Sequence, residues 1–471
     1  FGFAPFATTI GRQFDLTKGQ LVTLALCNLA LTIPARLVVG TLLDRFGPRR
    51  TFTGILVYSA GASLLFATAQ TFEMLVVSRL AVSVVGAGFV VGIRMVAEWF
   101  PRSELGTAEG IYGGWGNFGA AAATLGLPPL AALIGGPDAW RWATGGVGVA
   151  AALYGLAYYR AVDDTPAGVP FERTRSATAL QVPDRRSVFG LMALSVPLAM
   201  ALGVIVWRIR VAGVIDQAGL LAGLAFVAVL LGLQCTAIWR TNGAARANAV
   251  PAAEQYPFRS VVVLSVAYAC TFGSELAAVS FLPEYFERTW GLSEMAAGAA
   301  AAGFAVLNLV SRPMGGMLSD VVASRRRWLS TLLAGLSLGF VALSTVSGDW
   351  PVAAAFGLVV VTSLFAQLGN GAVYAIVPLV NKRASGQIAG MVGAYGNAGG
   401  IAFLATLLFA STGVGFLVMA GAAALAMVAG RWLVEPARGP AGVVAPAGDP
   451  TEPVAIAGGP AEVGTVPAWA G

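Results

Sequence analysis

The chain has 471 residues, of which 57% are hydrophobic and only 11% are charged. Soluble globular proteins have about 25% charged residues, so this composition excludes a soluble surface of such a size, and it is too apolar for a disordered chain. The formal net charge of +6 comes from short arginine clusters between apolar runs. It does not indicate a nucleic-acid partner, which would require a basic domain.

The side chains present exclude several kinds of catalytic site. The chain has no histidine, which rules out histidine-ligated metals, histidine general bases and catalytic triads. Its three cysteines, Cys27, Cys235 and Cys270, lie within apolar runs and are typical of core residues. No ATP-binding glycine–lysine motif occurs, which excludes a mechanism driven by ATP bound at such a motif. We expect no metal, no cofactor and no enzymatic activity.

The apolar stretches predict an all-α integral membrane protein. A membrane-spanning helix needs about 20 mostly apolar residues, and roughly fourteen stretches meet or approach this length. The first of them is short, so we expect a truncated first helix. The predicted spans are 1–10, 20–43, 51–70, 74–99, 105–135, 140–160, 188–207, 219–239, 259–282, 293–319, 327–346, 351–379, 386–411 and 413–433.

A polar stretch divides the predicted helices into groups, and a segment of unusual composition follows the last helix. Residues 161–187 are rich in Asp and Arg and predict a central cytoplasmic loop, whereas the Pro-, Gly- and Ala-rich end predicts a disordered tail. The expected organisation is a six-helix half, a loop, two extra helices, a second six-helix half and a cytoplasmic tail. These parts cover 1–160, 161–187, 188–258, 259–435 and 436–471.

The distribution of Lys and Arg predicts the orientation. Alternate loops carry most of these residues, including Arg45, Arg49 and Arg50, the run 325–327, and the pair 382–383. Because cytoplasmic loops carry the excess of basic residues, these loops and the C-terminus are predicted to be cytoplasmic. We therefore expect a multi-pass protein of the cytoplasmic membrane, in contact with lipid, and nothing in the sequence indicates more than a monomer.

Two pairs of segments show that the chain contains an internal repeat. Residues 36–44 match residues 312–320, with Arg, Gly and Asp at the same spacing, and the offset is 276. Residues 110–119 match residues 390–399, with several glycines and an Asn in common, and the offset is 280. Two matches at nearly one offset predict that the halves are copies, and parallel six-helix repeats with substrate at their interface describe one transporter architecture.

These segments resemble a known family. Residues 40–50, Gly-Thr-Leu-Leu-Asp-Arg-Phe-Gly-Pro-Arg-Arg, look like the loop between the second and third helices of the major facilitator superfamily. Residues 110–119 and 390–399 resemble the two nitrate signature segments of its nitrate/nitrite porter family. The resemblance covers about 1–435 and implies a carrier of nitrate and nitrite that works by alternating access. The two extra helices depart from the common pattern.

Arg36 and Arg312 are the first candidates for substrate binding. Each lies inside an apolar helix, where an Arg costs about 2.5–3.5 kcal/mol on insertion scales and is by default a functional hypothesis. A guanidinium is planar, permanently charged and forked, which suits a planar oxyanion. The resemblance implies that both residues clamp nitrate. The alternative is a structural Arg paired with carbonyls or a carboxylate, but no acid recurs beside either one.

The paired glycine–asparagine segments supply the next candidates. Gly116 and Gly396 allow close approach of helix backbones, and Asn117 and Asn397 can donate hydrogen bonds without adding charge. The resemblance implies that they contact the anion. The alternative, that the glycines are only packing surfaces, is compatible with this role.

Four aromatic residues are candidates through the resemblance alone. Tyr268 and Phe272 match the family's seventh-helix segment, and Phe89 matches a fourth-helix Phe. Tyr374 follows a Gly-Asn-Gly run in the corresponding helix of the second half. The resemblance implies that these rings wall the anion site. For any single aromatic residue in a membrane helix, packing against core or lipid is the common alternative.

Charged residues within helices suggest further roles. Glu275 is a candidate for proton coupling, with a structural partner of an Arg as the alternative. Arg94 and Glu98 are spaced to pair on one helix. Together with Asp44, Arg45 and Arg102 they resemble the superfamily's cytoplasmic charge network, which governs conformation. Arg79 is expected to be structural.

Nitrate and nitrite exchange is the function that this pattern favours. The lack of acids beside Arg36 and Arg312 favours exchange, whereas Glu275 favours nitrate:proton symport. A major facilitator transporter for another small anion is a further alternative. A membrane sensor or enzyme is disfavoured because no soluble catalytic or signalling domain and no metal-binding cluster is recognisable in the sequence.

Overall fold

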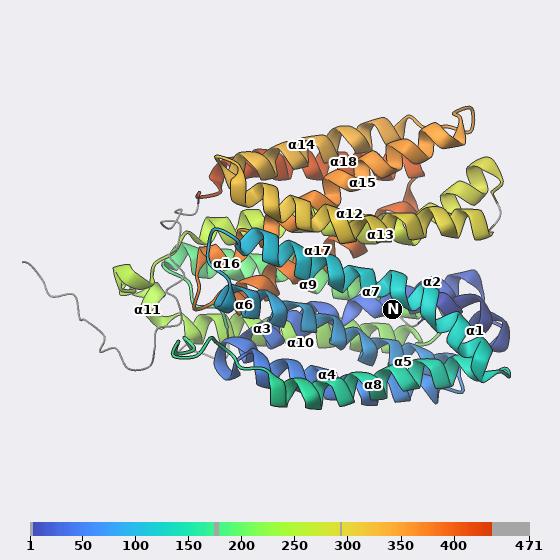
Figure 1. Cartoon of the computed structure of the whole chain (residues 1–471), viewed down its shortest axis with the longest axis horizontal. Coiled ribbons are helices and arrows are strands. Elements are labelled where there is room, and N and C mark those ends of the chain that lie inside the picture. Colours follow the sequence, from blue (N-terminus) through green and yellow to red (C-terminus); the bar gives the residue numbers. More distant parts are fainter. Residues whose placement is uncertain (1–2, 174–178, 293, 436–471) are drawn as a thin grey trace, which may run out of the picture.

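A computed structural model describes residues 3–173, 179–292 and 294–435, so the predicted tail 436–471 lies outside the described residues. In the described part the chain is built from helices joined by loops, and the long helices run along the longest axis of the molecule (Figure 1). The helices α12, α13, α14, α15 and α18 lie on one side in this view, and α4, α5 and α8 lie on the other.

The first half contains the helices before the central loop. Several predicted spans are divided into two or three helical segments: one α-helix ends before Leu31, and a 3-10 segment over 84–88, which contains two glycines, separates two others. The elements are η1 (Ala4–Phe6), α1 (Ala7–Gln13), α2 (Lys18–Ala30), α3 (Thr32–Phe46), α4 (Pro48–Ala67), α5 (Phe72–Ser83), η2 (Val84–Gly88), α6 (Phe89–Trp99), α7 (Leu105–Ile134) and α8 (Ala139–Ala161).

The inserted region supplies two long helices. Each starts at an aspartate whose side chain accepts from a backbone N–H of the first turn, Asp184 for one helix and Asp216 for the other. The elements are α9 (Arg185–Val211), α10 (Gln217–Thr241), α11 (Gly243–Arg246) and η3 (Ala252–Glu254).

The second half repeats the plan of the first. Its elements are α12 (Phe258–Trp290), α13 (Glu294–Val321), α14 (Arg325–Ser344), α15 (Val352–Tyr374), α16 (Val377–Val380), α17 (Ser385–Phe409), α18 (Thr412–Ala429) and η4 (Gly430–Trp432). A helix lies at every predicted span, but only ten segments of the described residues are long and apolar enough to cross a membrane. The other four predicted spans correspond to α1, which has only seven residues, and to α4, α8 and α13.

The two halves meet through the repeated segments. Helix α3 packs along α17, and its repeat counterpart α13 packs along α7. Glycines make both contacts possible: a Cβ on Gly40 would overlap the Gly386 carbonyl, and a Cβ on Gly316 would overlap the Gly106 carbonyl. Each interface therefore brings helix backbones into direct contact, as small residues do in membrane proteins.

The conserved spacing of the repeat places an aspartate at the end of each contact. Asp44 accepts from the N–H groups of Gly386 and Gln387 at 3.0 and 2.8 Å, at the start of α17. Asp320 accepts from Gly106 and Thr107 at 3.0 and 2.7 Å, at the start of α7. A carboxylate at a helix N-terminus is stabilising, so both aspartates hold the halves together at one end of the molecule, which we call the aspartate end.

Helix α9 connects the halves at a different place. It packs against α2 of the first half and α17 of the second. Tyr395 on α17 donates its hydroxyl to the carbonyl of Leu194 at 2.8 Å, and Arg208 reaches the carbonyl of Gly19 at 3.5 Å. The inserted helix therefore covers one face of α17, whereas the equivalent glycine-rich part of α7 stays partly exposed at Gly116 and Asn117.

Candidate anion-binding site

Arg36 and Arg312 both lie close to one aromatic ring, that of Phe272. They come from α3 and α13, and they are 5% and 2% exposed. The Arg36 guanidinium carbon lies 5.9 Å from the centre of the Phe272 ring, and that of Arg312 lies 5.3 Å from it. Two buried cations so close to one ring create a strongly positive region at the interface of the halves.

The predicted aromatic residues form one continuous cluster beside these arginines. Tyr268 stacks on Phe272 with ring centres 5.0 Å apart and meets Tyr374 edge-on at 4.9 Å. Tyr374 contacts Phe89 at 5.3 Å, and Phe89 stacks on Tyr112 at 5.3 Å. The cluster draws its rings from both halves and lines the region between the two arginines.

Glycines in the repeated segments let the arginines approach the opposite half. Arg36 donates to the carbonyl of Gly393 at 2.5 Å. A Cβ at Gly393 would lie 2.5 Å from Nη1 of Arg36. A Cβ at Gly113 would lie 3.2 Å from Nη1 of Arg312. Gly396 gives room to Tyr268 and Phe272, which a Cβ would approach to 2.6 and 2.8 Å. At these positions a side chain would displace the residues of the site.

The two asparagines are placed differently. With its amide oxygen turned to the guanidinium, Asn117 accepts from Nε and Nη2 of Arg312 at 3.1 and 3.0 Å. Asn397 is 2% exposed, and its Nδ2 has no hydrogen-bond partner in the described part of the chain. Asn117 therefore orients an arginine, while Asn397 presents an unused donor.

Glu275 is a partner of Arg312, which corrects the sequence-based expectation that no acid lies beside the arginines. Its Oε2 lies 3.6 Å from Nη2 of Arg312. Its two oxygens also accept from the amides of Asn308 and Asn370 at 2.7 and 2.6 Å. The carboxylate was hard to foresee because the pair joins two helices, α12 and α13. Two amide donors and a cation thus engage the carboxylate, which favours the structural alternative for Glu275.

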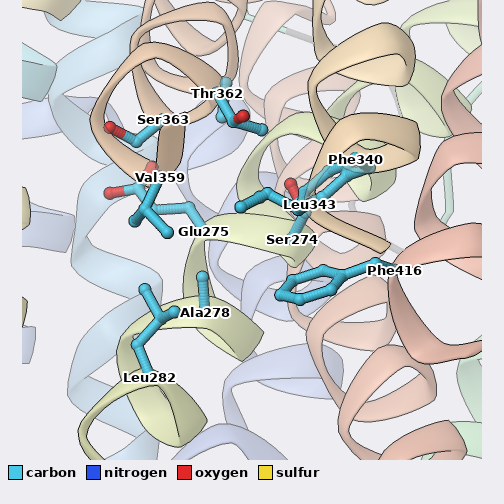
Figure 2. Close-up of a pocket in the computed structure, with 11 residues that line it drawn as sticks. Ser274, Glu275, Ala278, Leu282, Phe340, Leu343, Val359, Thr362, Ser363 and Phe416 are labelled. Atoms are coloured by element: carbon cyan, nitrogen blue, oxygen red, sulfur yellow. The ribbon is translucent and has the colours of Figure 1, made fainter. Parts of the chain in front are cut away.

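A cavity with an empty volume of about 290 Å³ borders Glu275 from inside the second half. Figure 2 shows Ser274, Glu275 and Leu282 of α12 at its wall, with Phe340 and Phe416 from neighbouring helices. Glu275 is the only charged side chain among its lining residues. Because it lacks an arginine, this cavity is distinct from the region between Arg36 and Arg312.

Three buried donors near the arginines have no hydrogen-bond partner among the described residues. They are Nε of Arg36, the hydroxyl of Tyr268 and Nδ2 of Asn397. A buried polar group without a partner is destabilising. Three such donors around a positive, aromatic-walled region form the arrangement that an anion would satisfy.

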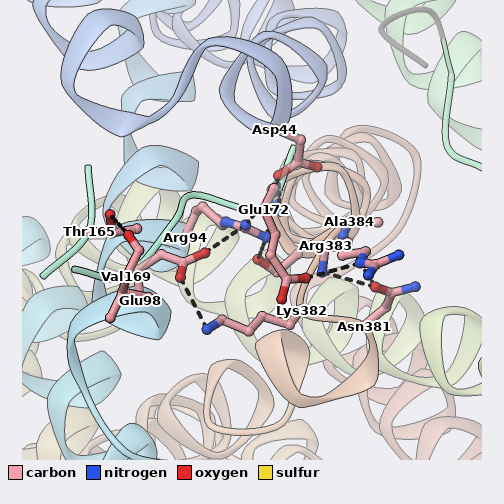
Figure 3. A network of polar contacts seen from close by, with 12 residues as sticks. Asp44, Arg94, Glu98, Thr165, Val169, Glu172, Asn381, Lys382, Arg383 and Ala384 are labelled. Carbon is pink, nitrogen blue, oxygen red and sulfur yellow. Dashed lines mark hydrogen bonds and ion pairs between the residues drawn. The ribbon is translucent and has the colours of Figure 1, made fainter. Parts of the chain in front are cut away.

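A separate charge network joins the halves near the aspartate end (Figure 3). Arg94 pairs with Glu98 at 2.6 Å and donates to the hydroxyl of Ser385 at 3.0 Å. Its Nη1 also lies 3.9 Å from Asp44, and Lys382 reaches Glu98 at 3.2 Å. Asp44, Arg94 and Glu98 therefore lie together, and residues of the second half complete the network.

Two of the predicted network members lie elsewhere. The exposed Arg45 stacks over the Phe46 ring at 5.1 Å, and Arg102 contributes only its carbonyl, which accepts from Arg325. Among the described residues neither side chain has an ion pair. Arg325 instead pairs with Asp320 at 2.8 Å, in the second-half counterpart of the network. Sequence spacing placed Arg45 next to Asp44 but could not show that its side chain points outward.

Sequence reasoning missed two residues next to the site. Tyr112 extends the aromatic cluster and donates to the carbonyl of Phe89 at 3.1 Å. Glu109, one helical turn earlier, is 1% exposed. Glu109 lies inside a predicted span, so the rule that flagged Glu275 would also have found it. By contrast Arg79 is buried and packs against the rings of Phe3 and Phe66, as expected for a structural residue.

Comparison with known proteins identifies the family. The family model described as Major Facilitator Superfamily matches residues 1–238 and 264–469. The nitrate/nitrite transporter NrtP of Picosynechococcus sp. is 44% identical over 87% of this chain and 81% of its own length. NrtP of Nostoc punctiforme is 43% identical over 89% of this chain and 87% of its own length.

Solved structures agree on the fold. The proton:xylose symporter XylE aligns with a TM-score of 0.61, at 13% identity and 92% coverage of each chain. The human organic anion transporter MFSD10 aligns with a TM-score of 0.59, at 14% identity, over 90% of this chain and 87% of its own. The curated relatives are transporters rather than enzymes. The chain belongs to the major facilitator superfamily and, within it, to the nitrate/nitrite porter family.

Proposed function

We propose that this chain carries nitrate and nitrite across the cytoplasmic membrane by alternating access, with the anion held between Arg36 and Arg312. The observation that carries the proposal is the set of three unpartnered buried donors beside these arginines: Nε of Arg36, the Tyr268 hydroxyl and Asn397 Nδ2. The relatives named nitrate/nitrite transporter support the choice of substrate.

The charges favour a monovalent anion. Arg312 already has Glu275 within 3.6 Å, so the pair of arginines retains one positive charge without a counter-charge beside it. One nitrate or nitrite would neutralise that charge. A planar oxyanion can also accept parallel hydrogen bonds from a planar guanidinium, and the flat rings of Phe272 and Tyr268 suit its shape.

The packing of the halves supports alternating access. Each arginine contacts the repeated segment of the opposite half, so an anion that engages both arginines draws the halves together. The aspartate end is closed by Asp44 and Asp320. We infer that this end faces the cytoplasm, with the C-terminus on the same side, and that the chain works as a monomer.

Two versions of this function differ in what drives the movement of nitrate: exchange for nitrite or uptake together with a proton. Nitrate/nitrite exchange is the version that the sequence favoured, on the argument that no acid lies beside the arginines. Glu275 removes that argument at Arg312. Proton-coupled uptake is the second version, and the buried carboxyl of Glu109 favours it.

The test is anion exchange in proteoliposomes that contain the full chain, with nitrite inside and labelled nitrate outside. We expect exchange by the parent, and a loss of at least about tenfold in Arg36→Lys and Arg312→Lys, because lysine keeps the charge but loses the fork. Arg79→Lys, the same change at a buried arginine remote from the site, is the matched control. Folded parent protein that moves neither anion would refute the proposal.

A further inference from the structure

Glu109 is a buried acid that the anion site does not use. It lies on α7, 1% exposed, and neither of its carboxyl oxygens has a hydrogen-bond partner among the described residues. The equivalent position of the second half is Ala389, so the repeat does not require an acid there. A buried carboxylate without a partner is strongly unfavourable, and the group is therefore stable here in its neutral, protonated form.

Within the part of the chain that the structure describes, no cation pairs with Glu109. It lies within electrostatic range of the hydroxyl groups of Tyr112 and Tyr374, and Arg36 acts on the same two hydroxyls. Neither tyrosine can neutralise a carboxylate. The nearest aromatic residues of the site thus lie within reach of both Glu109 and Arg36.

Most other charged groups on the helices packed against α7 have partners among the described residues. On α13, Arg312 pairs with Glu275, and Asp320 binds the first turn of α7 and Arg325. The remaining charged or titratable groups on these elements are Arg94 and Glu98 of α6, which pair with each other, and Arg141, Tyr154, Tyr158, Tyr159 and Arg160 of α8. At the far end of α13 from Asp320 lies Glu294, whose side chain is outside the described residues. The segment η1 has no titratable side chain.

The position of Glu109 couples it to the aspartate end. It lies one turn after Gly106, whose N–H binds Asp320, and eight residues before Asn117, about 12 Å along the helix axis. When the contact of α7 with α13 opens at this end, water reaches Glu109, and hydration stabilises its ionised form. Opening therefore changes the preferred protonation state of this one group.

We propose that Glu109 carries the proton that accompanies the anion: it is protonated while nitrate is bound and loses its proton to water once nitrate has left through the aspartate end. The ionised Glu109 then balances the single excess positive charge of Arg36, Arg312 and Glu275, as the anion did. The site thus has no net charge in either the loaded or the empty carrier when the protein changes between its inward-facing and outward-facing states. The stoichiometry is one proton per nitrate, and uptake is electroneutral.

This inference rests on the proposed function, and the experiment separates the two. Proteoliposomes with a lumenal pH dye measure exchange of nitrite for nitrate, nitrate uptake driven by an imposed pH gradient, and the effect of an imposed potassium diffusion potential. For the parent we expect one proton per nitrate and less than a twofold effect of the potential. A parent that exchanges anions but ignores the pH gradient overturns the role of Glu109 and leaves the proposed function intact.

Variants of Glu109 then test whether this residue carries the proton. Glu109→Gln fixes the neutral form, so we expect exchange within about threefold of the parent and at least a tenfold loss of gradient-driven uptake. Glu109→Asp should regain part of the proton coupling. The matched control is Glu104→Gln, the same change at an exposed acid just before α7, with parental coupling. Unchanged proton movement in Glu109→Gln overturns the inference; if that variant does not fold, the parent stoichiometry and Glu109→Asp decide.

Discussion

Arg36 and Arg312 occupy equivalent positions in the two halves, but their surroundings differ. Arg312 has a carboxylate at 3.6 Å and an asparagine oxygen at 3.0 Å, whereas Arg36 donates to one backbone carbonyl and keeps an unpartnered Nε. Arg312 is thus positioned by protein groups before any substrate arrives, and Arg36 is the arginine with free capacity. Equivalent residues of a repeat can therefore have different roles: Arg312 is fixed by protein partners, and Arg36 keeps a donor for the substrate.

The largest expected effect comes from removing the counter-charge of Arg312. Breaking a buried ion pair by removing one partner costs about 3–5 kcal/mol. We expect Glu275→Gln to lower the midpoint of thermal unfolding in detergent by at least about 4 °C, and nitrate to restore part of the loss. Glu284→Gln, which breaks an exposed pair with Arg288 on the same helix, should change it by less than 1 °C. Equal effects of the two changes would contradict the assigned partnership.

The next effect compares the glycines that face the two arginines. A methyl group at Gly393 would lie 2.5 Å from Arg36 Nη1 and 3.0 Å from the Tyr374 hydroxyl, whereas one at Gly113 would lie 3.2 Å from Arg312. Overpacking costs about 1–3 kcal/mol. We therefore expect Gly393→Ala to lower nitrate affinity about 30-fold and Gly113→Ala about threefold, measured as the concentration dependence of exchange. The reverse order would show that Arg312 is the more constrained residue.

A smaller effect separates the two asparagines. Asn397→Ala removes a free donor, and a hydrogen bond to a charged group contributes about 1.5–3 kcal/mol, so nitrate affinity should fall at least about tenfold. Asn117→Ala leaves Arg312 with Glu275, and we expect a loss of about threefold. Exchange kinetics at several nitrate concentrations provide the measurement. An unchanged affinity in Asn397→Ala would remove that residue from the site.

The smallest effect concerns the aspartate end. Asp320 binds two backbone N–H groups and pairs with Arg325 at 2.8 Å, whereas Asp44 has a cation only at 3.9 Å. Asp320→Asn should therefore speed amide hydrogen exchange at the start of α7 more, by about tenfold, than Asp44→Asn does at the start of α17, by about threefold. Identical protection in both variants and the parent would show that these carboxylates do not close the end.

The internal repeat predicted much of this arrangement. Matching residues 36–44 with 312–320, and 110–119 with 390–399, indicated that these segments belong to equivalent helices of two repeats, with the substrate expected at the interface of the halves. The differences between the halves could not be predicted in the same way. The pair of Glu275 and Arg312 joins different helices, and Glu109 has no counterpart in the repeat. The covering of α17 by α9 depends on the packing of an inserted helix whose sequence shows only that it is apolar.

Direct binding of nitrate to the purified chain tests the central claim. This claim is that an anion lies between two arginines, of which Arg36 has the unpartnered donor. Isothermal titration of the parent should give one nitrate per chain, with nitrite competing for the same site. We expect Arg36→Lys to weaken binding at least about tenfold, while Arg79→Lys binds as the parent does. Parental affinity in a folded Arg36→Lys variant would contradict the account, because the arginine with the free Nε would then contribute nothing to the anion.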